Sequence, residues 1–138
     1  MRTALSRPID PATAEPLALR LALLGLCAAY VQGPITKLAD FGGAIAEMRH
    51  FGLHPAAPMA VGVILFELVA SAMIVCGVGR RAAAAALALF TCAATLLALR
   101  FWELPAGTPA RIMAMNGFFE HIGLAAAFAM IAMGRLAR

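Results

Sequence analysis

Long apolar runs alternate with short polar breaks along this chain. Crossing a bilayer takes about 20 apolar residues in a helix. Four runs are that long, and they extend from about Leu17 to Thr36, Ala56 to Val78, Ala82 to Leu99 and Ile112 to Met133. Only Gly79, Arg80 and Arg81 separate the second run from the third, which predicts an antiparallel helical hairpin. The pattern therefore predicts an all-α fold, an integral membrane four-helix bundle.

The segment between the first two runs, residues 37–55, is too short and too polar to cross a membrane. Its apolar residues recur at helical spacing, at Phe41, Ile45 and Met48. We expect a short amphipathic helix that lies flat at the outer interface, capped by Asp40 and ended by Gly52 and Pro55.

Composition supports the same class of protein. The 138 residues are 63% hydrophobic and 13% charged, whereas soluble domains carry about 25% charged residues. We expect a flexible tail over residues 1–16, where prolines are frequent, and one membrane domain over residues 17–138. The net charge of +4 comes from residues scattered at the ends of the runs. The pattern favours contact with the lipid bilayer and argues against a nucleic-acid partner.

The distribution of basic residues predicts the orientation. One side of the membrane would hold seven of them, Arg2, Arg7, Arg20, Arg80, Arg81, Arg135 and Arg138. The other side would hold four, Lys37, Arg49, Arg100 and Arg111. The positive-inside rule then puts both termini and the turn at Arg80 and Arg81 in the cytoplasm.

Polar residues inside the runs are the candidate functional groups. Glu67 is the only charged residue between Ala56 and Val78, and an acidic residue at a helix centre costs about 3 kcal/mol on insertion scales. The fourth run carries Glu120 and His121 at a similar depth. We expect a polar column that opens to the outer face, with Glu67, Glu120 and His121 deepest, Asn116 above them, and the mouth formed by Lys37, Arg100, Glu103 and Arg111.

Two interpretations of this column stay open. The polar groups satisfy one another and hold the helices in register, or they bind a small molecule that exchanges protons. A buried Glu near a His suits quinone chemistry and suits a proton-coupled carrier equally well. His50 and His54 are four residues apart, but Gly52 and Pro55 argue against a continuous helix there, so we expect no metal site. Cys27, Cys76 and Cys92 all fall inside apolar runs, and we expect them to be buried, reduced thiols.

Three stretches of the chain resemble the DoxX family of small four-helix bacterial membrane proteins. They are residues 35–41 (ITKLADF) and 48–55 (MRHFGLHP), and residues 118–124 (FFEHIGL) in the fourth run; Glu67 in the second run also matches. The resemblance marks Lys37, Glu67 and His121 as family-typical positions. The chain departs from the family at residues 100–102, where many relatives carry a His-x-x-Trp sequence, and at residues 125–126, where a pair of glycines is common.

Family members are similar to a membrane subunit of a thiosulfate:quinone oxidoreductase. The resemblance therefore implies a membrane subunit of a quinone-linked redox system, with a protein partner in a redox complex. Glu67 and His121 would exchange protons with the quinone or hydrogen-bond it, Lys37 and Arg100 would orient a polar ligand, and Asn116 and Glu120 would line the site. Two alternatives remain, a non-catalytic scaffold or assembly protein and a small proton-coupled transporter. A homo-oligomer stays open.

Overall fold

The computed structural model describes residues 15–135. Its helices, in chain order, are α1 (Leu17–Ala39), α2 (Phe41–His50), α3 (Ala56–Cys76), α4 (Arg80–Ala98), the 3-10 helix η1 (Phe101–Glu103) and α5 (Pro109–Ala132). The predicted tail, residues 1–16, lies outside the described residues apart from Glu15 and Pro16. Four of these helices, α1, α3, α4 and α5, are long and apolar enough to cross a membrane. The predicted all-α class and the short helix between the first two spans are confirmed.

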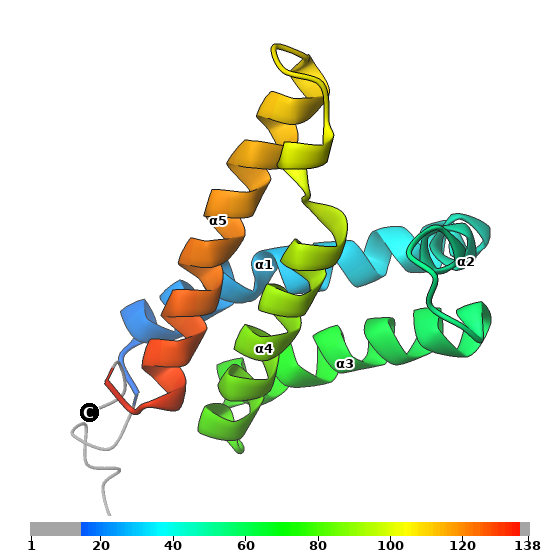
Figure 1. The fold of residues 1–138 in the computed structure, drawn as a ribbon. Coiled ribbons are helices and arrows are strands. Elements are labelled where there is room, and N and C mark those ends of the chain that lie inside the picture. The colour runs from blue at the N-terminus through cyan, green and yellow to red at the C-terminus, as the bar shows by residue number, and fades with distance from the viewer. Residues whose placement is uncertain (1–14, 136–138) are drawn as a thin grey trace, which may run out of the picture.

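The four long helices form two pairs (Figure 1). Helix α1 packs against α3, and α4 packs against α5, while α3 also packs against α4. The pairs meet in a core cluster whose largest members are Leu23, Tyr30, Ile74, Leu87, Phe128 and Ile131. From this end the two pairs diverge in Figure 1, α1 and α3 toward α2, and α4 and α5 toward η1. The core therefore joins all four spans near the turn between α3 and α4.

The turn between α3 and α4 is built on glycine. Gly77 and Gly79 have φ values of 82° and 62°, a left-handed conformation that costs a residue with a Cβ about 1–2 kcal/mol. Arg80 then donates through Nε to the carbonyl oxygen of Ile74 at 2.7 Å, which satisfies a carbonyl near the end of α3. The predicted helical hairpin is confirmed.

Helix α2 begins at the predicted cap. The Asp40 side chain accepts a hydrogen bond from the backbone N–H of Gly43 at 2.8 Å. The buried side of α2 contributes Ala44 and Met48, which cluster with Ala56 and Ala60 of α3. The helix thus packs its apolar side on a neighbouring span, and its position at the outer interface stays a prediction.

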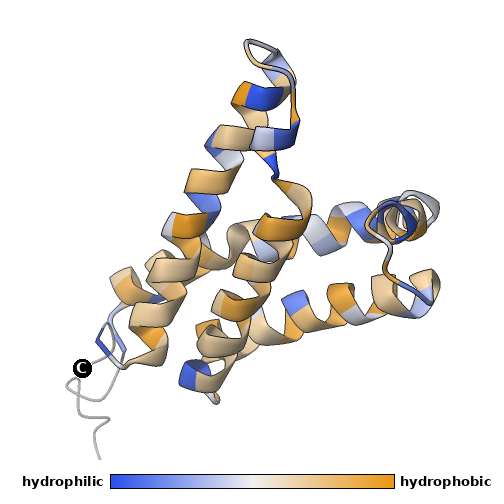
Figure 2. Cartoon of the chain, viewed as in Figure 1, coloured by the Kyte–Doolittle hydropathy of each residue, from blue (hydrophilic) through white to orange (hydrophobic). Residues whose placement is uncertain are grey.

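The long helices consist mostly of hydrophobic residues, as Figure 2 shows, while hydrophilic residues gather at α2 and in the loop between α4 and α5. Exposed large residues include Leu21, Leu65, Val69, Leu89 and Phe119. Such a surface is stable only against lipid. The protein is a multi-pass membrane protein whose spans contact the bilayer.

Candidate functional site between α1, α2 and α3

Glu67 lies in the middle of α3 and is buried, with 8% of its surface exposed. Its Oε2 atom has no hydrogen-bond partner, and the Ser71 Oγ one turn later has none either. A buried polar atom without a partner costs about 1–3 kcal/mol. Buried polar groups are paired in most proteins, so an unpaired carboxylate oxygen calls for a functional explanation.

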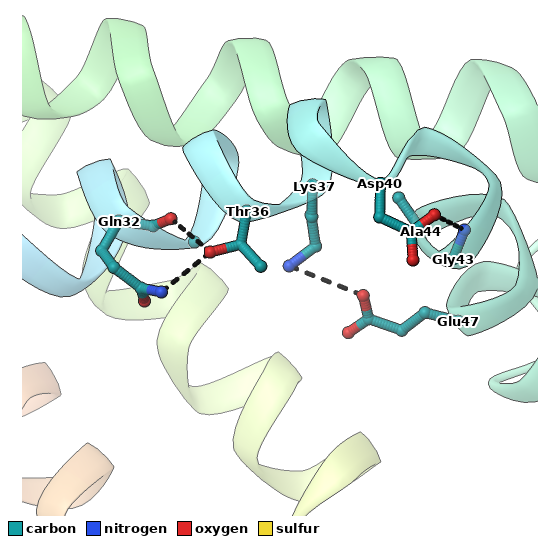
Figure 3. A pocket seen from close by; sticks show the side chains of 8 residues that line it. Gln32, Thr36, Lys37, Asp40, Gly43, Ala44 and Glu47 are labelled. Carbon is teal, nitrogen blue, oxygen red and sulfur yellow. Dashed lines mark hydrogen bonds and ion pairs between the residues drawn. The ribbon is translucent and has the colours of Figure 1, made fainter.

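A cavity of about 270 Å³ lies beside this carboxylate, between α1 and α2. It is lined by Gln32, Gly33, Thr36, Lys37, Asp40, Gly43, Ala44 and Glu47 (Figure 3). Gly33 connects the cavity with Glu67, because a Cβ placed on Gly33 would lie 3.7 Å from Glu67 Oε2. Gly33 is thus the residue shared by the cavity lining and the surroundings of the Glu67 carboxylate. The cavity volume is near the lower end of the range of about 300–1,000 Å³ for small-molecule sites.

Charged groups of both signs line the cavity. Lys37 Nζ lies 3.5 Å from Glu47 Oε2, and the two side chains point toward each other from α1 and α2 in Figure 3. The Lys37 side chain is 20% exposed, and the charges of both residues act on Glu67. An ammonium group has three N–H donors, so Lys37 can keep its contact with Glu47 and donate to a ligand as well.

Hydrogen bonds order the cavity wall beside Lys37. Gln32 Nε2 donates to Thr36 Oγ1 at 2.8 Å, and Thr36 Oγ1 donates to the Gln32 carbonyl oxygen at 3.0 Å. The α1 face beside Gly33 is thereby polar and held in place. A ligand in this cavity would meet hydroxyl, amide and ammonium groups on one side and a carboxylate behind Gly33.

His121 belongs to a different polar group, between α4 and α5. Its Nδ1 lies 2.9 Å from Thr95 Oγ1, and Thr95 Oγ1 donates to the Thr91 carbonyl oxygen at 2.6 Å. A hydroxyl has one hydrogen. Thr95 therefore accepts from His121, which fixes the Nδ1–H tautomer and leaves Nε2 as the second ring nitrogen.

The same reasoning extends to Tyr30. Its hydroxyl lies 2.5 Å from Thr91 Oγ1, and Thr91 Oγ1 donates to the Leu87 carbonyl oxygen at 2.7 Å. Tyr30 is therefore the donor. The ring of Tyr30 also packs edge-on against Phe128, with the ring centroids 5.4 Å apart. These contacts tie α1, α4 and α5 together in the core.

The predicted meeting of Glu67 with Glu120 and His121 stays a prediction, and the contacts of the described residues give it no support. Helix α3 packs against α1, α2 and α4, whereas α5 packs against α4 and η1. Within residues 15–135, no hydrogen bond or ion pair joins Glu67 to either residue. Two residues at similar depth in the membrane lie close together only if their helices are neighbours. Here α3 and α5 each pack against α4.

The remaining predicted residues also separate into groups. Asn116 and Glu120 are exposed on α5. Arg100 donates to the Leu96 carbonyl oxygen at 3.0 Å and lies 3.3 Å from Glu103, and Arg111 donates to the Leu104 carbonyl oxygen at 3.0 Å. A second cavity of about 320 Å³ lies here, lined by His50, Phe51, Leu97, Ala98, Arg100, Glu103, Leu104 and Ala114. The predicted outer mouth is thus divided between Lys37 on α1 and Arg100 beyond α4.

Sequence reasoning missed Gly33, Glu47 and Thr95 as parts of these polar groups. Glu47 carried a usable signal, because it lies ten positions after Lys37 across the Asp40 cap, where a turn brings two helices together. Gly33 and Thr95 carried none, since their importance depends on which helix each one faces.

The cysteines differ from the prediction in their burial. All three are free; Cys27 is buried, but Cys76 and Cys92 are exposed on the helix surface. A cysteine behaves as a small hydrophobic residue and is tolerated on either face of an apolar helix. The position of a cysteine within an apolar run therefore did not predict whether it is buried or exposed.

Comparison with known proteins gives one match. A sequence model of the DoxX family matches residues 16–100, which cover α1 to α4 and every residue of the cavity beside Glu67. Helix α5, with the resemblance at residues 118–124, lies beyond the matched region. Searches of curated proteins and of solved structures matched none to this chain. The match covers well over half of the chain, which therefore belongs to the DoxX family.

Proposed function

We propose that this protein is the membrane subunit of a quinone-linked redox system and that the cavity between α1 and α2 holds the quinone head group. The buried Glu67 Oε2, which has no hydrogen-bond partner and lies behind Gly33 in the cavity wall, carries this proposal. A lipid-soluble ligand is consistent with a site inside a membrane domain, and the family resemblance points to the same ligand class.

The residues present fit a quinone. When bound, a quinone supplies a carrier of two electrons and two protons that stays within the bilayer. Lys37 would donate to a carbonyl oxygen of the ring, because its ammonium group has N–H donors to spare beside Glu47. As the partner's electrons reduce the quinone, protonated Glu67 would give its proton to a ring oxygen, and its carboxylate would then accept a hydrogen bond from the new hydroxyl. Its burial keeps that proton from exchanging freely with water.

His121 has a different place in this proposal from the one that the sequence predicted. Its Nδ1 is held by Thr95 of α4 and it is absent from the lining of the cavity between α1 and α2, so Glu67 and Lys37 would carry the proposed head-group contacts. Electrons would come from a protein partner, as the family resemblance implies. The resemblance also supports the bacterial inner membrane, and the charge distribution supports both termini in the cytoplasm.

Direct quinone binding tests the proposal. The purified protein in lipid nanodiscs would be titrated with ubiquinone-1 and menaquinone-1, in oxidised and reduced forms, with the fluorescence of the single tryptophan, Trp102, and equilibrium dialysis as readouts. Loss of a hydrogen bond to a charged group costs about 1.5–3 kcal/mol. Glu67→Gln should therefore weaken binding of the reduced form about 10- to 150-fold.

Glu120→Gln is the matched control, because it makes the same chemical change at an exposed carboxylate on α5. We expect it to bind the reduced form as tightly as the wild type does. Equal binding by wild type and Glu67→Gln, or no quinone binding by the wild type, would overturn the proposal. The second result would favour the scaffold alternative if a protein partner co-purifies.

A second pair of variants tests the role of Gly33 without removing any charge. Gly33→Leu would place a side chain between Glu67 and the cavity, whereas Gly25→Leu lies on the same helix with nothing within 4 Å of its Cβ position. Binding should be lost in the first variant and kept in the second. The same affinity in both would show that the ligand does not approach Glu67 through this wall.

A further inference from the structure

Helix α5 is the least covered of the four spans. In its apolar window 11% of the residues are buried, against 33% in α3. Its main packing partners are α4 and η1, and Phe128 also contacts Tyr30 of α1. The packed side contains Gly117, His121 and Phe128. The opposite side of a helix that crosses a membrane normally carries only apolar residues.

A regular stripe, which we call the α5 stripe, runs along the flank of the helix next to its packed side. Its members follow one another at alternating spacings of three and four residues, and they are Met113, Asn116, Glu120, Gly123, Ala127 and Met130. All are exposed except Ala127, which is half-buried. This spacing is the seam by which two helices pair in a left-handed coiled coil.

The two polar members of the stripe cannot be satisfied by lipid. Asn116 and Glu120 are one turn apart, both exposed, and neither has a hydrogen-bond partner among the described residues. Polar and ionisable side chains inside a bilayer face a partner or a water-filled space. The stripe therefore requires a covering surface that offers hydrogen-bond donors and acceptors at the same depth.

We propose that the α5 stripe is the interface of a homodimer, covered by α5 of a second copy of this chain. Copies inserted in one membrane share one orientation, so a two-fold axis along the membrane normal brings identical residues together at equal depth. The Asn116 amide both donates and accepts. It therefore bonds Asn116 of the second copy, and it donates to Glu120 of that copy.

The rest of the stripe suits the same occupant. Gly123 is small and open, with nothing within 4 Å of its Cβ position, and Ala127 follows it at a spacing of four residues. Small residues at this spacing allow two helix backbones to approach closely. Self-pairing needs no further complementary residue, because each polar group of the stripe finds its partner in the identical stripe.

Disulfide cross-linking in vesicles of the purified protein tests the proposal. In a background in which Cys76 and Cys92 are replaced by Ser, Met113→Cys places a thiol on the stripe. Met115→Cys places one two positions away, on another exposed side of the same helix. Mild oxidation should convert most of the Met113→Cys protein to a covalent dimer and leave Met115→Cys monomeric. Equal cross-linking of the two variants, or none in the first, would overturn the proposal.

The contribution of Asn116 to the stability of the proposed dimer can be measured separately. The dimer dissociation constant would be obtained by single-molecule photobleaching in vesicles at decreasing protein-to-lipid ratio. Asn116→Leu should raise this constant about tenfold or more, while Ile122→Leu on another exposed side should leave it unchanged. An unchanged constant in Asn116→Leu would contradict the pairing of the amides. The stripe shares no residue with the cavity between α1 and α2, so failure of this proposal would leave the quinone site untouched.

Discussion

Replacing Glu67 by Leu separates a binding role from a structural one, because the two roles predict opposite changes in stability. If Glu67 holds the bundle together, its removal destabilises the protein. If Glu67 serves to bind a ligand, its unpaired burial destabilises the ligand-free protein, and replacing it stabilises the protein. Proteins commonly lose stability at sites of function in this way.

The structure sets the expected magnitude. Glu67 is 8% exposed and its Oε2 lacks a partner, so removal relieves about 1–3 kcal/mol of unpaired burial. Leu has a similar size and fills the same space. Lys37 loses an attraction but keeps Glu47 at 3.5 Å. We therefore expect Glu67→Leu to raise the free energy of unfolding by about 1–3 kcal/mol.

Reversible unfolding in mixtures of a mild detergent and dodecyl sulfate, followed by circular dichroism, measures this change. Thr91→Val is the matched control, because it removes the acceptor of the buried Tyr30 hydroxyl and should lower the free energy of unfolding by about 0.5–1.5 kcal/mol. A loss of stability in Glu67→Leu comparable to that of the control would refute the reasoning. It would show that Glu67 cements the helices.

Three further predictions concern other parts of the molecule. Hydrogen bonds from Arg80 hold the pKa of Glu15 below its ordinary value of 4.5, against a smaller opposing effect of desolvation. Their stabilisation is therefore present above pH 4.5 and lost as the pH falls toward the lowered pKa, so the stability difference between wild type and Glu15→Gln should shrink below pH 4.5 in unfolding titrations. Nitrogen NMR should find His121 as the Nδ1–H tautomer, and Thr95→Val should abolish this preference; an Nε2–H tautomer in the wild type would contradict the hydrogen-bond assignment. Finally, a thiol introduced as Val78→Cys should react with an impermeant maleimide in inverted membrane vesicles and not in intact spheroplasts, and the reverse result would invert the proposed topology.

The number, order and approximate limits of the spans were predictable from the sequence. Each apolar run became one long helix, because the bilayer requires satisfied backbone groups over about 20 residues. The cap at Asp40 and the turn at Gly79 were predictable for local reasons, since side-chain capping and positive φ depend on neighbouring residues alone.

The composition of the site was only partly predictable. The sequence singled out Glu67 and Lys37, because an ionisable group in or beside an apolar run is costly wherever the helices lie. It also assigned His121 to the same site, whereas the observed contact of His121 is with Thr95 of α4, because depth along a helix does not determine which neighbour a residue faces. Gly33 has no side chain that could mark it in the sequence as part of a site. Its closeness to Glu67 is known only once the packing of α1 against α3 is known.

Titration of the nanodisc-embedded protein with reduced ubiquinone-1, for the wild type and Glu67→Gln side by side, tests the central claim most directly. If the cavity between α1 and α2 is a quinone site, the wild type binds saturably and Glu67→Gln binds about 10- to 150-fold more weakly. Equal binding by the two proteins, or no saturable binding by the wild type, would contradict it.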